Sequence, residues 1–106
     1  MDSEPQPPKA HQLFVESFPK LAVAWEKINE AGQEGPLDKK MARLLKLAVA
    51  IGAMREGAVH SSVRKALAAG ISRAELLQVV ALSAGTLGLP ATVAAFSWVL
   101  DETDKQ

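Results

Sequence analysis

Regularly spaced helix breakers constrain this chain more than any other feature of its sequence. The stretches between the breakers carry apolar residues at i, i+3 and i+4, the spacing that lines one face of a helix. No stretch shows the pattern of a strand. The sequence therefore predicts an all-α fold, one compact helical domain of about five helices joined by short loops. The breakers are Gly32, Gly35, Pro36, Gly52, Gly57, Gly70, Gly85, Gly88 and Pro90.

Local signals place the ends of these helices. Asp38 is predicted to be the N-cap of one helix, because its side chain can accept a hydrogen bond from a free backbone N–H. Ser72 is followed three residues later by Glu75, the pattern of a capping box. Gly70 fits the position just after a helix, where a left-handed backbone favours glycine. The predicted helices span 19–32, 39–54, 56–69, 73–86 and 90–103.

The chain has 106 residues, enough for one small domain. Residues 1–10 contain three prolines and no apolar period, so they are predicted to form a flexible N-terminal tail, and 11–106 the helical domain. The N-terminus lacks the basic start and apolar run of a signal peptide. No apolar run reaches the roughly 18 residues of a membrane span. A cytoplasmic protein without a membrane partner is the resulting prediction.

Charge and residue usage exclude several functions. Twelve basic and twelve acidic residues balance, so there is no basic excess for nucleic acid. The chain has no cysteine, which excludes thiol catalysis, disulfides and thiolate metal sites. With only His11 and His60, no metal site or cofactor is predicted. Trp25 and Trp98 are interpreted as anchors of the core or of an interface, and Met41 as core filler.

The stretch 54-MREGAVHSSVRKALAAG-70 concentrates the polar candidates. His60 shares one helical face with Glu56 and Arg64, four residues away on either side. Ser62 is two residues from His60, about 200° around the helix, so the two side chains point apart. His60 is therefore interpreted as a surface or interface histidine held by its neighbours. A catalytic role displaced by two residues is the alternative.

Residues 40–96 resemble the carboxymuconolactone decarboxylase family, which includes the alkylhydroperoxidase D-like proteins. The resemblance is carried by LLKLAVA, VRKALAAGISRAEL and AGTLGLPATVAAF in this order and spacing. It implies an alkylhydroperoxidase D-like helical bundle that assembles into homotrimers or homohexamers. It also implies either peroxidase (peroxiredoxin) activity or lactone decarboxylation.

The catalytic positions of both branches of the family differ here. The peroxidase branch has Cys-x-x-Cys, a His four residues later and a Glu on the preceding helix, and these positions correspond to Arg55, Ala58, Ser62 and Arg43. No thiolate nucleophile is left. The decarboxylase branch is matched by Arg55 and Arg64, but Ala58 and Ser62 replace its Glu and His. Whether the chain is an enzyme stays open.

Arg43 and Arg55 replace residues that face the active pocket in the relatives. Paired guanidinium groups bind carboxylates well. One hypothesis is a thiol-independent binder of a small organic acid, or a decarboxylase-like enzyme acting on one. Another is a non-catalytic oligomeric binding or scaffold protein, with the arginines paired across an interface. A third is an oxidative-stress helper that keeps only the fold. The candidate ligand pocket is Arg43, Arg55 and Ser62, with Glu56, His60 and Arg64 as secondary candidates.

Overall fold

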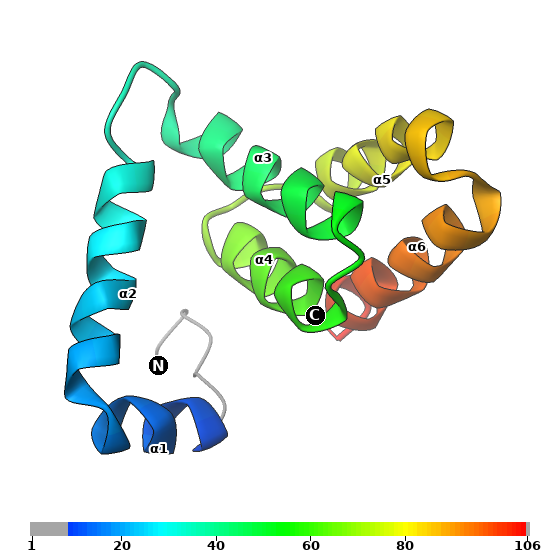
Figure 1. The fold of residues 1–106 in the computed structure, drawn as a ribbon. Helices are drawn as coiled ribbons and strands as arrows, with labels where there is room; N and C mark the ends of the chain where they lie inside the picture. The colour runs from blue at the N-terminus through cyan, green and yellow to red at the C-terminus, as the bar shows by residue number, and fades with distance from the viewer. Residues whose placement is uncertain (1–8, 106) are drawn as a thin grey trace.

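Six α-helices make up the structure, a computed structural model that describes residues 9–105 (Figure 1). No strand occurs within this range, which confirms the predicted all-α fold. None of these helices is long and apolar enough to cross a membrane. The helices are α1 (Lys9–Ser17), α2 (Pro19–Gly32), α3 (Lys39–Gly52), α4 (Glu56–Ala68), α5 (Arg73–Leu87) and α6 (Leu89–Thr103).

The first helix was not predicted, so the count is six and not five. Helix α1 begins at Lys9, inside the segment predicted to be a flexible tail, while residues 1–8 of that segment lie outside the described residues. Pro19 explains the division from α2, because a proline lacks the N–H needed inside a helix and fits its first turn. Accordingly, Phe18 is the N-cap of α2 and Pro19 its first residue.

Helices α3 to α6 form the bundle. Helix α3 packs against α4 and α5, and α6 packs against the same two helices. The core between them is built from aliphatic side chains, as the composition indicated, with half-buried Trp98 packed against it. The largest fully buried side chains are Leu47, Ile51, Val59, Val63, Leu76 and Val99.

The predicted caps at Asp38, Ser72 and Gly70 are confirmed, whereas α3 ends at Gly52, two residues before the predicted end at 54. The Oδ1 of Asp38 accepts a hydrogen bond of 2.7 Å from the Met41 N–H, and both bonds of the Ser72–Glu75 capping box are present. Gly70 has φ +88°, and the Ile71 N–H reaches back to the Ala66 carbonyl at 3.0 Å, which closes α4 with a Schellman turn.

The bend between α3 and α4 has an unexpected pivot. Gly52 and Gly57 flank it, but the left-handed residue is Met54, with φ +54°. The Arg55 N–H donates to the Ala50 carbonyl at 3.1 Å, so the same Schellman pattern ends α3. The two glycines therefore loosen this segment without occupying its strained position.

Helices α1 and α2 form an arm that extends away from the bundle (Figure 1). They pack against each other, and neither packs closely against α3 to α6. No residue of either helix is buried. Trp25, interpreted as an anchor of the core or of an interface, is exposed on this arm and so is not a core anchor of the single chain. Met41, interpreted as core filler, is also exposed.

Candidate functional site

A basic cleft of about 500 Å³ lies where the end of α2, the first half of α3 and the turn after α4 meet. Helix α3 supplies four cations of its lining: Lys39, Lys40, Arg43 and Lys46. Lys39, Arg43 and Lys46 are spaced at i, i+4 and i+7, which places them on one helical face. The N-cap at Asp38 fixes the start of this face, and the Gly70 turn forms the opposite wall.

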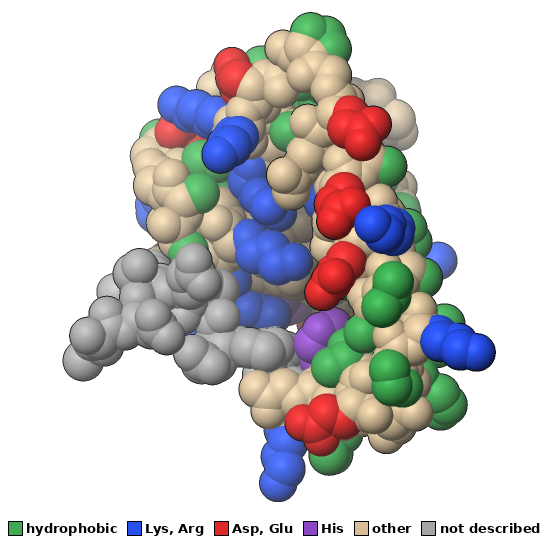
Figure 2. All heavy atoms as spheres, turned by 90° about the vertical axis from the view of Figure 1, so that its left-hand side faces the viewer, with side chains coloured by type: hydrophobic (Ala, Val, Ile, Leu, Met, Phe, Trp, Pro, Cys, Tyr) green, Lys and Arg blue, Asp and Glu red, His purple; other side chains and the backbone are tan. Residues whose placement is uncertain are grey.

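Three of these cations have no counter-charge in the part of the chain that the structure describes. Within residues 9–105, none of Lys39, Arg43 and Lys46 makes an ion pair, whereas the neighbouring Lys40 pairs with Glu75 at 2.5 Å. Figure 2 shows Lys and Arg side chains gathered one above another in a hollow of this face, beside a row of acidic side chains. The cleft is therefore electropositive although the chain as a whole is neutral.

The pKa of Lys65, on α4, reflects this field. Burial lowers the pKa from its ordinary value of 10.5, and the positive charges of Arg43, Lys46 and Arg64 lower it further. Three cations crowding a fourth raise the free energy of the folded chain unless an anion lies among them.

The other members of the predicted pocket lie elsewhere. Arg43 lines the basic cleft, but Arg55 and Ser62 do not. Arg55 is the exposed N-cap residue of α4, beyond the far end of α3. At 1.5 Å per residue, the backbone of Arg43 is about 14 Å from that end of α3. Ser62 is partly buried, nearly two turns into α4.

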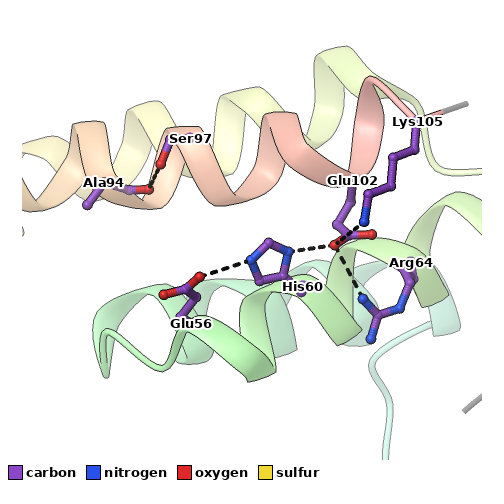
Figure 3. Close-up of polar contacts among 7 residues, drawn as sticks. All are labelled: Glu56, His60, Arg64, Ala94, Ser97, Glu102 and Lys105. Carbon is purple, nitrogen blue, oxygen red and sulfur yellow. Dashed lines mark hydrogen bonds and ion pairs between the residues drawn. The ribbon is translucent and has the colours of Figure 1, made fainter. Parts of the chain in front are cut away.

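A second polar cluster joins α4 to α6 (Figure 3). Glu102 is only 3% exposed, and its Oε2 accepts hydrogen bonds from His60 Nδ1 at 2.5 Å, Arg64 Nη1 at 3.3 Å and Lys105 Nζ at 3.4 Å. The other ring nitrogen of His60, Nε2, lies 3.4 Å from the Glu56 carboxylate. Two of the secondary candidates, His60 and Arg64, thus contact an acid that the sequence analysis did not single out, and the third, Glu56, contacts His60 from the other side.

The charge state of Glu102 follows from these contacts. Burial alone would raise its pKa, but the hydrogen bond from His60 and the charges of Arg64 and Lys105 lower it below the ordinary value of 4.5. Glu102 is therefore ionised at neutral pH, and since a carboxylate only accepts, His60 must carry its proton on Nδ1. The imidazole is oriented by Glu102 and is mostly shielded from solvent, being 18% exposed.

One signal in the sequence could have revealed Glu102. Ala95, Val99 and Glu102 follow one another at i, i+4 and i+7, so Glu102 continues the apolar face of the last helix. A carboxylate at such a position is almost never buried unless it is paired. Within the described residues, no group of three His, Asp or Glu side chains is arranged to hold a metal ion.

Comparison with known proteins identifies the family. A sequence profile of the carboxymuconolactone decarboxylase family matches residues 19–101, most of the chain, and the chain therefore belongs to this family. The fold is similar to that of a carboxymuconolactone decarboxylase family protein from Legionella pneumophila, whose crystal structure was solved in the apo form. The TM-score is 0.77 at 23% identity, and the match covers 91% of this chain and 88% of that chain. No curated protein sequence matches the chain.

Proposed function

We propose that this family member binds a small organic acid in the basic cleft, independently of any thiol, with Arg43 as the main ligand of the carboxylate. The observation that carries the proposal is the set of cations Lys39, Arg43 and Lys46 on one wall, none of which has an ion-pair partner among residues 9–105. A guanidinium group holds a carboxylate through two parallel hydrogen bonds, and the flanking ammonium groups add charge without competing for that geometry. The crowded Lys65 supports the same conclusion, because an anion relieves its repulsion.

Binding is favoured over turnover. A decarboxylase-like reaction needs a proton donor or acceptor within hydrogen-bond reach of the substrate. Among residues 9–105, no histidine and no carboxylate lines the basic cleft. His60 is held at the junction of α4 and α6, where its Nδ1 is bonded to Glu102. The cysteine-free sequence removes the thiolate route as well.

The experiment is calorimetric titration of small carboxylic acids, such as benzoate and succinate, into four proteins. Arg43→Gln is expected to weaken binding about tenfold or more, because a hydrogen bond to a charged group contributes about 1.5–3 kcal/mol. Arg73→Gln is the matched control, because Arg73 lies outside the cleft and faces Asp104 at 3.6 Å. Equal affinities for wild type and Arg43→Gln, or no binding by wild type, would contradict the proposal.

Arg55→Gln is the fourth protein and tests the pocket predicted from sequence. A ligand held in the cleft alone is expected to bind this variant as it binds wild type. A loss equal to that of Arg43→Gln would mean that both arginines hold one ligand, as the sequence analysis predicted.

A non-catalytic scaffold of the same fold is the second candidate function. The specific observation in its favour is the arm, which has no buried residue within its own chain. Self-assembly into a homotrimer or homohexamer belongs to both proposals, as does a cytoplasmic location. A role as an oxidative-stress helper has no support beyond family membership.

A further inference from the structure

The arm formed by α1 and α2 lacks the contacts that would stabilise it. Seven of its eight large apolar side chains are between 48% and 63% exposed, although Phe14 and Phe18 touch with ring centroids 5.4 Å apart. Helices of 9 and 14 residues are marginal in water when nothing packs against them. A cluster of exposed apolar side chains such as this one marks an interaction surface. The arm therefore needs a partner outside the contacts described so far.

The apolar side chains of the arm converge on one groove. It has a volume of about 390 Å³ and lies in the angle between α1 and α2. Phe14 contributes from α1, and Leu21, Trp25 and Ile28 contribute from one face of α2. The only polar side chain in its lining is His11. The groove therefore suits aliphatic side chains presented by a helix.

Helix α3 presents a surface of this kind. Leu47 and Ile51 of this helix face the core. The outward side carries Met41, Leu45 and Val49, spaced at i, i+4 and i+8. All three are exposed, Val49 by 72%. A helix that is apolar on opposite sides is normally covered on both. In the single chain, only the inward side is covered.

The size of the chain points the same way. A compact monomer of 11.3 kDa is expected to expose about 5,700 Å². This chain exposes 7490 Å², and its radius of gyration is 14.5 Å, against about 13 Å expected for its length. If half of the excess is assigned to the chain ends, the remainder is still about 900 Å², close to the 800 Å² or so that each partner buries in a standard interface.

We propose that the groove of one copy receives the outward face of α3 from a second copy. Charge favours α3 over α6, which also carries a row of exposed apolar side chains, Leu89, Val93 and Phe96. Helix α3 carries no acid that would repel Glu26 on α2 and Glu34 just after it, neither of which makes an ion pair within residues 9–105. The end of α6 instead carries the exposed acid Asp101, which would repel them. This contact is independent of ligand binding in the basic cleft.

Light scattering of full-length variants at micromolar concentration tests the contact. Ile28→Asp and Val49→Asp are each expected to lower the mass to the 11.3 kDa of one chain, because each places a charge in the apolar interface. Val93→Asp is the matched control, because it makes the same change at an exposed apolar residue of α6. This variant is expected to keep the mass of wild type. Dissociation by Val93→Asp without dissociation by Val49→Asp would overturn the proposal, as would a monomeric wild type.

Disulfide cross-linking gives a second readout that does not depend on destabilising the protein. The chain has no cysteine, so Ile28→Cys combined with Val49→Cys introduces the only thiols. Oxidation of this double variant is expected to link chains covalently, whereas Ile28→Cys combined with Val93→Cys is expected to give only background. Linkage in the second pair alone would mean that α6 occupies the groove, which would refute the contact with α3.

Discussion

Replacement of Glu102 by glutamine tests the cluster that joins α4 to α6. The change keeps the shape of the side chain and removes the charge that His60, Arg64 and Lys105 share. The short hydrogen bond from His60 is of the charged kind, which contributes about 1.5–3 kcal/mol. The contacts at 3.3 and 3.4 Å involve side chains that are partly exposed, so each contributes about 0.2–1 kcal/mol.

Glutamine recovers part of this loss, because it can still accept a hydrogen bond and is easier to bury than a carboxylate. We therefore expect Glu102→Gln to lower the free energy of unfolding by about 2 kcal/mol. With a urea dependence of about 2 kcal/mol per M, the denaturation midpoint should fall by about 1 M. The measurement is urea denaturation followed by far-UV circular dichroism at one fixed protein concentration.

The pH dependence gives the sharper test. Because the pKa of Glu102 is lower in the folded chain than its ordinary value of 4.5, its contribution is complete above that value and is lost as the pH falls through the folded-state pKa. The difference between wild type and Glu102→Gln should therefore shrink on acidification below about pH 4. Glu56→Gln is the control, because Glu56 is 61% exposed and should change stability by less than about 0.5 kcal/mol. A midpoint for Glu102→Gln equal to that of the control, or a gap that persists in acid, would refute this reasoning.

Three further predictions follow from the charges, the sequence and the assembly. Lys65→Gln is expected to raise the urea midpoint at pH 7, because burial and the neighbouring cations lower the pKa of Lys65 and its charge therefore destabilises the folded state. Wild type should also gain stability as the pH rises toward 10.5, and an unchanged midpoint would contradict this reasoning. Consumption of an organic hydroperoxide with a dithiol donor should not exceed that of an inert protein, because the chain has no cysteine, and genuine turnover would contradict this. Light scattering should give three or six times 11.3 kDa, and a single-chain mass would disprove self-assembly.

The helices of the bundle could be predicted from sequence because their signals are local. A capping box, an aspartate N-cap and a glycine after a helix each act over about four residues, and Asp38, Gly70 and the Ser72–Glu75 pair behave in the structure as they do in sequence patterns. The first helix was missed because its segment lies between a proline-rich start and Pro19, both of which weaken a helical pattern.

The polar cluster could not be predicted in the same way because its central contact is not local. His60 and Glu102 are 42 residues apart, and only the packing of α4 on α6 brings them together. Sequence spacing identified the neighbours of His60 on its own helix, Glu56 and Arg64, and could not identify a partner on another. The same limit applies to Arg43 and Arg55, which the family pattern assigns to one pocket and the structure places toward opposite ends of α3.

Helix α3 shows how one short segment separates the proposed ligand site from the proposed partner site. At 100° per residue, Leu47 and Ile51 point toward the core, Lys39, Arg43 and Lys46 lie to one side of them, and Met41, Leu45 and Val49 point away. A substitution on one of these faces therefore leaves the other two in place. If the proposals are both right, Arg43→Gln should weaken carboxylate binding without changing the mass, and Val49→Asp should change the mass without removing a cation from the cleft. A single substitution that abolished both would mean that ligand and partner share one surface, which this arrangement of side chains does not allow.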